Sequence, residues 1–169
     1  MTHLVVVCGL PGVGKSTIAR AVAGEVDAEL LHTDALRKEV KSDLRYDREE
    51  TRYVYALLLD RARDHLEAGE TVVLDGTFRR AVYREWARDL AGRLDVDFEV
   101  ARVRCDESVA LQRIADRDPT MSDASLGTYY EVMKSYEDLS MDHVTIDNSR
   151  SRETTELQVR SWCAQALSP

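Results

Sequence analysis

The sequence predicts a three-layer α/β/α domain, in which helices cover both faces of a parallel β-sheet. Five short apolar, strand-like runs alternate with seven segments of helical periodicity. Strands that alternate with helices form parallel βαβ units, whose sheets are covered on both faces. A glycine-rich loop joins the first strand to the first helix, as expected at a phosphate-binding site. Ligands of such folds bind beyond the carboxyl ends of the strands, so the residues that follow each strand are the candidates for function.

The expected elements follow one another along the whole chain. The strands fall on residues 4–8, 29–32, 71–75, 98–105 and 143–147. The helices fall on residues 15–24, 34–41, 48–68, 80–92, 107–116, 123–138 and 152–167. No Pro- or Gly-rich linker and no internal repeat divides the sequence, so residues 1–169 are expected to form one domain.

Composition and charge narrow the class of protein. No apolar run approaches the roughly 20 residues that span a bilayer, so no membrane partner is expected. The net charge of −8 argues against a protein that grips long nucleic acid by general electrostatics. The three cysteines lack metal-type spacing and fit a reduced cytoplasm, which is the expected location.

Residues 9–16 fill every fixed position of the phosphate-binding loop pattern. Glycines let main-chain N–H groups converge on phosphate oxygens, and the following helix N-terminus adds partial positive charge. Lys15 is expected to reach the β- and γ-phosphates of a nucleoside triphosphate, and the Ser16 hydroxyl to bind Mg²⁺. The alternative is a glycine-rich turn that only connects strand to helix, and the fixed residues disfavour it. The expected nucleotide-binding residues are Gly9, Pro11, Gly12, Val13, Gly14, Lys15, Ser16 and Thr17.

Asp34 and Arg37 follow the second strand at the start of a helix. Because they are three residues apart, they project from neighbouring turns on the side of the nucleotide. A carboxylate there can take the proton from an attacking hydroxyl, and an arginine can hold an anionic group of the acceptor. The alternative is that Thr33 or Asp34 only caps the helix while Arg37 is solvated. The phosphate loop upstream favours the catalytic interpretation.

An apolar third strand delivers Asp75, which Gly76 follows. In many phosphate-loop proteins such an aspartate orients Mg²⁺ or one of its waters, so Asp75 is predicted to join Ser16 at the metal. Two alternatives stay open, namely contact with the acceptor and a simple turn before glycine. Further candidates for lining an acceptor cleft are Thr77, Arg79, Arg80 and Arg84.

Arg113 and Arg117 lie four residues apart, and so on one face, in the helix after the fourth strand. Pro119 breaks that helix and Ser122 or Asp123 starts the next, which is typical of a lid, here over about residues 113–125. Arginines of a lid can close over the transferred phosphoryl group and neutralise its charge in the transition state. The alternative pairs both arginines with nearby surface carboxylates.

With these motifs the chain resembles the small P-loop kinases that phosphorylate hydroxyls, and AAA-type ATP-binding domains. These kinases include polynucleotide 5′-hydroxyl kinases, gluconate- and adenylylsulfate-type kinases, zeta-type toxins and chloramphenicol phosphotransferases. The polynucleotide kinase pattern falls in order on residues 9–16, Asp34/Arg37, Asp75 and Arg113/Arg117. The resemblance implies a P-loop NTPase fold with strand order 2-3-1-4-5 and a helical lid. It also implies that Asp34 is the general base, that Arg37 touches the acceptor, and that the two lid arginines contact the nucleotide's phosphates.

The expected function is transfer of the γ-phosphoryl group of ATP to a hydroxyl, with Mg²⁺ as cofactor. The expected catalytic residues are Lys15, Asp34, Arg37, Arg113 and Arg117. A polynucleotide 5′-hydroxyl and a small metabolite are the candidate acceptors, and the protein is expected to be a monomer or a homodimer. Two alternatives remain, namely an ATPase or switch that binds a macromolecular partner, and a nucleoside monophosphate kinase. A GTPase switch is disfavoured because the chain has no Asn-Lys-x-Asp motif.

Overall fold

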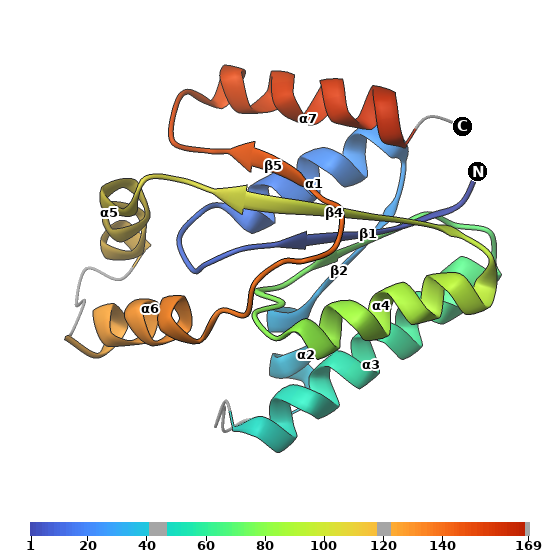
Figure 1. Cartoon of the computed structure of the whole chain (residues 1–169), viewed down its shortest axis with the longest axis horizontal. Helices are drawn as coiled ribbons and strands as arrows, with labels where there is room; N and C mark the ends of the chain where they lie inside the picture. The colour runs from blue at the N-terminus through green and yellow to red at the C-terminus, as the bar shows by residue number, and fades with distance from the viewer. Residues whose placement is uncertain (41–46, 118–122, 168–169) are drawn as a thin grey trace.

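Five parallel strands form the centre of the computed structural model (Figure 1), which describes residues 1–40, 47–117 and 123–167. The strands are β1 (His3–Cys8), β2 (Glu29–His32), β3 (Val72–Asp75), β4 (Asp97–Arg104) and β5 (Val144–Asp147). Their order across the sheet is β2-β3-β1-β4-β5. The central strand β1 pairs in parallel with β3 and β4. The predicted parallel sheet and its strand order are therefore confirmed.

Helices cover both faces of this sheet. They are α1 (Lys15–Val26), α2 (Thr33–Val40), α3 (Arg48–Glu67), α4 (Ala81–Leu94), α5 (Glu107–Arg117), α6 (Asp123–Ser135) and α7 (Arg152–Ala166). Helices α1 and α7 pack on one face, and α3 and α4 on the other (Figure 1). This arrangement confirms the three-layer prediction. Within the ranges that the structure describes, no helix has the length and apolar character needed to cross a membrane.

The alternation of side chains along β1 divides the core between the two faces. Leu4 and Val6 pack with the buried residues of α3 and α4, whereas Val5 and Val7 pack with those of α1 and α7. Successive side chains of a strand point to opposite faces, so a strand covered on both sides needs an uninterrupted apolar run. All of β1 is buried, which fixes the position of its carboxyl end, where the phosphate loop begins.

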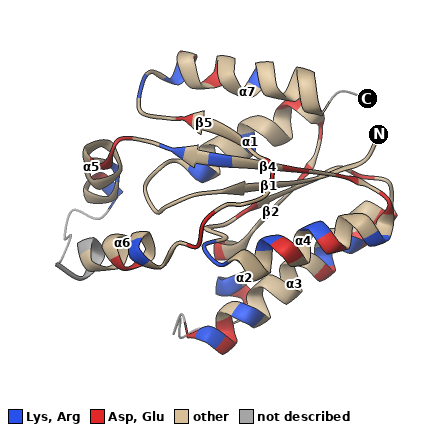
Figure 2. Ribbon diagram, in the orientation of Figure 1, with Lys and Arg blue, Asp and Glu red and all other residues tan. Residues whose placement is uncertain are grey.

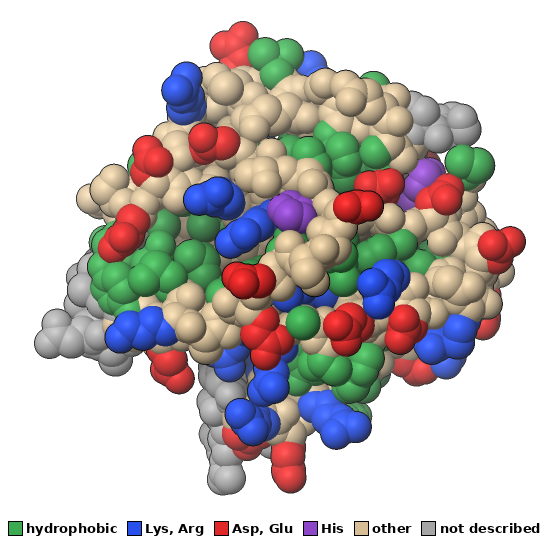
Figure 3. All heavy atoms as spheres, viewed as in Figure 1, with side chains coloured by type: hydrophobic (Ala, Val, Ile, Leu, Met, Phe, Trp, Pro, Cys, Tyr) green, Lys and Arg blue, Asp and Glu red, His purple; other side chains and the backbone are tan. Residues whose placement is uncertain are grey.

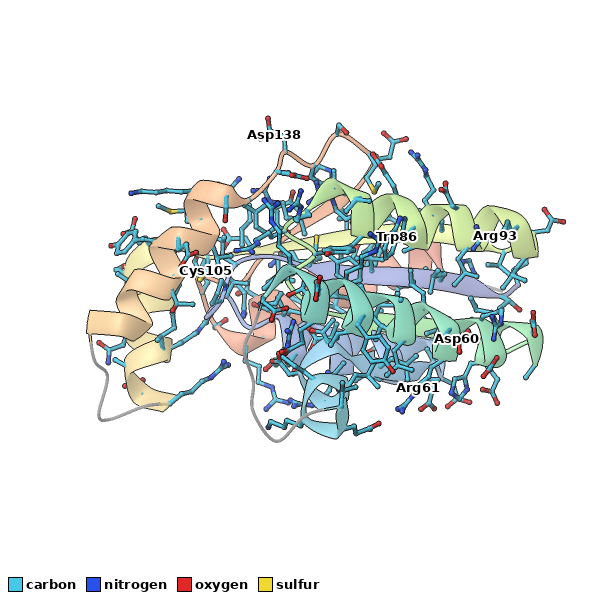
Figure 4. All side chains as sticks on the ribbon, turned by 90° about the horizontal axis from the view of Figure 1, so that it is seen from below. Asp60, Arg61, Trp86, Arg93, Cys105 and Asp138 are labelled. Carbon is cyan, nitrogen blue, oxygen red and sulfur yellow. The ribbon has the colours of Figure 1, made fainter. Side chains whose placement is uncertain are left out.

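The outer surface carries charges of both signs. Figure 2 shows basic and acidic residues interspersed along α3 and α4, and Arg61 of α3 pairs with Glu39 at 2.6 Å. Figure 4 labels Asp60 and Arg61 on α3 and Arg93 on α4, on the side of the molecule away from α5 and α6. The face shown in Figure 3 likewise mixes both signs among its described residues. Long basic tracks, which bind nucleic acid electrostatically, are not visible on that face.

Helix α6 ends at Ser135, before the predicted end at residue 138. The next segment, residues 136–138, crosses the start of α4 and is called the strap below; Figure 4 labels its Asp138. The Tyr136 hydroxyl donates to the Thr77 carbonyl oxygen at 2.7 Å, and the Glu137 N–H donates to the Arg79 carbonyl oxygen at 2.8 Å. These long-range hydrogen bonds take the backbone out of the helix, which explains the shorter α6.

Candidate active site

The phosphate loop, residues 9–16, turns sharply between β1 and α1. Gly12 and Gly14 have φ angles of 77° and 89°, in the left-handed region that favours glycine. A Cβ at Gly14 would lie 2.3 Å from Asn148 Nδ2, and a Cβ at Gly12 would lie 2.7 Å from the Ala110 carbonyl oxygen. Both positions therefore require glycine for their torsion and for space. The loop ends at the N-terminus of α1, where free N–H groups favour a phosphate.

The predicted nucleotide-binding residues differ in their exposure and in whether they line a cleft. Gly9 and Val13 are buried behind the loop, and Thr17 is exposed in the first turn of α1. The others line a large cleft at the carboxyl ends of the strands; they are Pro11, Gly12, Gly14, Lys15 and Ser16. Five of the eight predicted residues thus face the cleft.

Asn148, in the turn after β5, is hydrogen-bonded to the phosphate loop. Its Nδ2 donates to the Val13 carbonyl oxygen at 2.8 Å, and its Oδ1 accepts from Thr155 Oγ1 at 3.0 Å. Arg113 donates to the same Val13 oxygen at 3.3 Å and to the Asn148 carbonyl oxygen at 2.8 Å. Asn148 is a site residue that the sequence analysis missed. Its place after a strand of the parallel sheet was the available signal.

The two arginines of the predicted lid lie on different surfaces. Arg117 is exposed and lines the cleft. Arg113 does not line the cleft, because it is directed to the outside of the phosphate loop. Helices α5 and α6 lie beyond the carboxyl ends of β4 and β5 (Figure 1), and Figure 4 labels Cys105 where the chain leaves β4. Residues 118–122 of the predicted lid lie outside the described residues, so closure of a lid stays a prediction.

Lys15 is directed back over the loop, where its Nζ donates to the Leu10 carbonyl oxygen at 2.9 Å. Burial lowers the pKa of Lys15, and the negative charges of Asp75 and Asp34 act in the opposite direction. Those two carboxylates are thus close enough to interact with the ammonium electrostatically. A half-buried cation beside a phosphate-binding loop is suited to a phosphate anion.

Asp75 receives side chains from two neighbouring elements. Ser16 Oγ donates to Asp75 Oδ2 at 2.6 Å, and His32 Nδ1 lies 2.8 Å from the same oxygen. The register of the sheet places His32 beside Asp75, because the two residues are partners at the ends of β2 and β3. Asp75 is only 5% exposed. The sequence analysis did not identify His32, because its contact depends on this strand pairing.

The oxygen atoms of Ser16 and Asp75 fit a magnesium ion. Mg²⁺ prefers hard oxygen ligands and is usually held by one or two carboxylates together with substrate phosphates and water. In the described part of the chain, no group of three or more His, Cys, Asp or Glu side chains could hold a metal ion. Mg²⁺ at this position would therefore depend on a bound nucleotide to complete its ligands.

Asp34 and Arg37, in the first two turns of α2, both line the cleft. The Asp34 side chain is exposed, so it is open to a ligand in the cleft. Arg37 is buried, and its Nη1 donates to Glu50 Oε1 of α3 at 3.1 Å. The arginine therefore connects α2 to α3 in this structure. A contact between Arg37 and the acceptor stays a prediction.

The further candidates after β3 do not all line the cleft. Thr77 and Arg79 line the cleft. Arg84 does not, and the expectation for it was wrong. It is 1% exposed and donates to the carbonyl oxygens of Phe78 at 2.8 Å and of the strap residues Glu137 at 3.1 Å and Asp138 at 2.8 Å. Arg84 therefore holds the strap against α4 rather than facing a ligand.

The cleft has a volume of about 1070 Å³, and its described lining residues carry an excess of positive charge. Ligand sites commonly occupy roughly 300–1,000 Å³, so this cleft has room for a nucleotide and a second substrate. Its acidic side chains are Asp34, Asp75 and Glu131. Its basic side chains are Lys15, Arg20, Arg37, Lys38, Arg79 and Arg117. This local excess, in a chain of net charge −8, favours an anionic ligand.

Comparisons with known proteins agree with this fold and loop. A protein-family model described as the AAA domain matches residues 4–139. An uncharacterized protein of Mycobacterium tuberculosis is 36% identical over 138 residues, which cover 73% of this chain. The match covers only 27% of the relative's own length, so the chain spans about a quarter of that protein.

Two solved kinases have a similar structure over nearly their whole length. The APS kinase of Mycobacterium tuberculosis, in complex with AMPPNP and APS, has a TM-score of 0.78 and 19% identity, covering 99% of this chain and 98% of that one. A gluconokinase from Sinorhizobium meliloti has a TM-score of 0.74 and 20% identity, covering 97% of this chain and 92% of that one. At these identities the likeness shows a shared fold.

Proposed function

Because the chain belongs to the AAA domain family, whose model matches residues 4–139, we propose that it is an ATP-dependent kinase that phosphorylates a hydroxyl. One observation carries this proposal. The phosphate-binding residues Lys15 and Ser16 and the exposed carboxylate of Asp34 line the same cleft, which has room for two substrates. A switch that only binds a nucleotide needs neither a carboxylate in this cleft nor room for a second substrate. The family resemblance to small P-loop kinases and the two similar kinase structures support the same conclusion.

In the proposed mechanism, the phosphate loop holds the donor. Its backbone N–H groups and the Lys15 ammonium bind the β- and γ-phosphates of ATP. Ser16 and Asp75 would hold Mg²⁺, which, when bound, neutralises charge on those phosphates. Arg117 lies on the wall of the cleft and would approach the phosphates from the side of α5. Catalysis then depends on position and charge, because the protein forms no covalent bond with the phosphoryl group.

Asp34 is the proposed general base. As the acceptor oxygen forms its bond to the γ-phosphorus, the proton of that hydroxyl passes to the Asp34 carboxylate. The bond between the γ-phosphorus and the bridging oxygen breaks at the same time, and ADP leaves with that oxygen. The products are ADP and the phosphorylated acceptor, and the proton on Asp34 is released to water. Arg37 and Arg113 belong to the proposal as positioning groups, on the acceptor side and behind the loop respectively.

The proposal also covers the cellular location, the partners and the oligomeric state of the protein. The three cysteines are free thiols, which agrees with the cytoplasm as the proposed location. The proposed partners are ATP and an acceptor that bears a hydroxyl, either a small metabolite or a nucleic-acid 5′ end. We propose a monomer or a homodimer as the active form.

The experiment that tests the proposal follows the fate of the γ-phosphoryl group. Purified protein is incubated with γ-labelled ATP, Mg²⁺ and a panel of nucleosides, sugars, sugar acids, aminoglycosides and 5′-hydroxyl oligonucleotides. We expect label on at least one acceptor, and we expect Lys15→Ala to abolish it. Label that is released only as inorganic phosphate, whichever acceptor is present, would contradict the kinase and favour an ATPase.

A further inference from the structure

A recess opens from the wall of the cleft, near the starts of α3 and α4. No residue of the phosphate loop lines it, and neither does Asp75. Its volume is about 50 Å³. Four residues border both the recess and the cleft, namely Thr51, Tyr55, Thr77 and Arg79. The rest of its lining is Asp47, Arg48, Arg80 and Tyr83. Because the two spaces share a wall, the recess is a side extension of the cleft that holds Asp34.

Among the residues that the structure describes, the lining of the recess carries net positive charge. Its three arginines face one described acidic residue, Asp47, whose Oδ1 accepts from the Glu50 N–H at 2.8 Å and so caps α3. Arg80 lies 3.8 Å from Glu137. Among the described residues, neither Arg48 nor Arg79 forms an ion pair; Arg79 donates to the Ser135 hydroxyl at 3.3 Å. Two guanidinium groups at this recess are therefore not neutralised by any carboxylate of the described part of the chain.

Arg37 differs from these arginines in its environment. It is buried and paired with Glu50 at 3.1 Å, so much of its charge is already balanced. An anion that enters this end of the cleft would therefore be attracted more strongly toward Arg48 and Arg79. Arginine is suited to this task because its planar group can donate two parallel hydrogen bonds to one oxyanion.

The size and the polar lining of the recess limit the group that it can hold. One water needs about 10–15 Å³ of such space, so about 50 Å³ accommodates a group of a few heavy atoms. The hydroxyls of Thr51 and Thr77 add hydrogen-bonding groups. The Tyr55 hydroxyl accepts from the Phe78 N–H at 2.9 Å. Burial raises the pKa of Tyr55 to about 12, so this hydroxyl stays neutral and adds no negative charge to the recess.

We propose that the recess is an oxyanion subsite and that the acceptor is a small molecule that bears both the reacting hydroxyl and a carboxylate, sulfate or phosphate group. The oxyanion binds between Arg48 and Arg79, while the hydroxyl lies at Asp34. This inference rests on the proposed kinase function and names the substrate class of the same site. A small acceptor is favoured over a polynucleotide because the recess accommodates a group of only a few heavy atoms, and the face shown in Figure 3 mixes charges of both signs.

The subsite is tested by binding, independently of catalysis. Sulfate is titrated by calorimetry into protein that is saturated with AMPPNP and Mg²⁺, so that the phosphate loop is already filled. We expect a saturable sulfate site, with binding weakened about tenfold by Arg48→Gln and by Arg79→Gln. Arg88→Gln, on the exposed face of α4, is the matched control and should bind as the parent does. Thermal unfolding confirms that each variant is folded.

Two results would overturn the subsite. One is the absence of saturable sulfate binding in the AMPPNP complex, and the other is equal affinity in the parent, Arg48→Gln and Arg79→Gln.

A second measurement compares acceptors. With γ-labelled ATP, we expect label on sugar acids or sugar phosphates in preference to neutral sugars of the same length, and a KM for that acceptor that rises in Arg79→Gln while kcat changes less. Label only on 5′-hydroxyl oligonucleotides, or equally on charged and neutral sugars, would contradict the inference while the kinase function stands. If sulfate binds as expected but no acceptor is labelled, it is the kinase proposal that fails.

Discussion

The Ser16 hydroxyl donates a 2.6 Å hydrogen bond to the Asp75 carboxylate, and this contact joins the start of α1 to the end of β3. His32 from β2 approaches the same carboxylate oxygen at 2.8 Å. Side chains from two other elements thus meet at a single oxygen atom of a buried aspartate. The parallel pairing of β2, β3 and β1 is what brings them together, because all three strands end at the same edge of the sheet.

Asp75→Asn should weaken the proposed magnesium site. An asparagine keeps the size of the side chain but removes the negative charge that a hard cation requires. We expect the Mg²⁺ concentration for half-maximal activity to rise, and kcat/KM at fixed Mg²⁺ to fall about 10- to 100-fold. The measurement is a magnesium titration of the labelled-ATP assay. Asp89→Asn, on the exposed face of α4, is the control; an unchanged magnesium dependence in Asp75→Asn would rule out the metal role.

Asn148→Ala should weaken nucleotide binding indirectly, through the shape of the phosphate loop that Asn148 contacts. The substitution removes the donor that holds the Val13 carbonyl oxygen at 2.8 Å and leaves only the longer bond from Arg113. Loss of one such hydrogen bond costs about 1 kcal/mol, so the affinity for AMPPNP should fall about fivefold. Calorimetry measures it. Thr155→Val removes the partner of Asn148 Oδ1 and the bond of the same hydroxyl to the Ser151 carbonyl oxygen at 3.2 Å, and should have a smaller effect on nucleotide affinity. Equal affinities in all three proteins would contradict a role of Asn148 in shaping the loop.

Lys15→Met should stabilise the nucleotide-free protein while it abolishes activity. Burial lowers the pKa of Lys15 below its unfolded value of 10.5, so the charged ammonium costs free energy in the folded state. The folded protein binds fewer protons than the unfolded chain between the lowered pKa and 10.5, so this residue's contribution to stability rises with pH across that window.

Lys15→Met removes the amine, and with it both the free-energy cost of the charged ammonium in the folded state and the rise of stability with pH. We expect the free energy of unfolding at neutral pH to rise by about 1 kcal/mol and its increase toward pH 10 to become less steep. Urea denaturation at several pH values measures both quantities. Lys134→Met, at an exposed lysine of α6, is the matched control and should leave the stability unchanged. A Lys15→Met protein that is less stable than the parent would contradict the account of a cation whose desolvation costs folding free energy.

Arg84→Met should destabilise the fold. The guanidinium donates to three carbonyl oxygens, and a thioether side chain leaves all three without this partner. Loss of a buried, charge-assisted network of this kind costs about 2–4 kcal/mol of unfolding free energy. AMPPNP affinity should change little in the protein that remains folded. Arg88→Met on the same helix is the control, and equal stability of the two variants would contradict the role of Arg84 in holding the strap.

Much of the fold could be predicted because its signals are local. The uninterrupted apolar run of β1 reports burial on both faces, and the glycines of residues 9–16 report a tight loop before a helix. The strand order came from family resemblance, since the strand patterns do not specify their neighbours. Ser16 and Asp75 could be assigned to one site because Asp75 ends one strand, Ser16 follows the loop after another, and both strands end at the same edge.

The rest depends on contacts between residues that are far apart in the chain. Arg84 has the local pattern of a cleft residue, yet the strap, more than 50 positions later, occupies its guanidinium. Arg113 shares a helical face with Arg117 in the sequence, but the turn after β5 holds it behind the phosphate loop. In the same way, Arg37 is paired with Glu50 across two helices. Helical spacing predicts which residues share a face, and only packing decides what that face meets.

The most direct test of the central claim is Asp34→Asn in a single-turnover assay. With the acceptor identified by the label-transfer panel, we expect phosphoryl transfer to slow about 10²- to 10⁴-fold, which is the usual contribution of a general base. AMPPNP affinity should stay equal to that of the parent and of the control Asp89→Asn, because Asp34 acts on the acceptor hydroxyl. Transfer by Asp34→Asn as fast as by the parent, with nucleotide binding intact, would contradict the proposed role of Asp34 as the base.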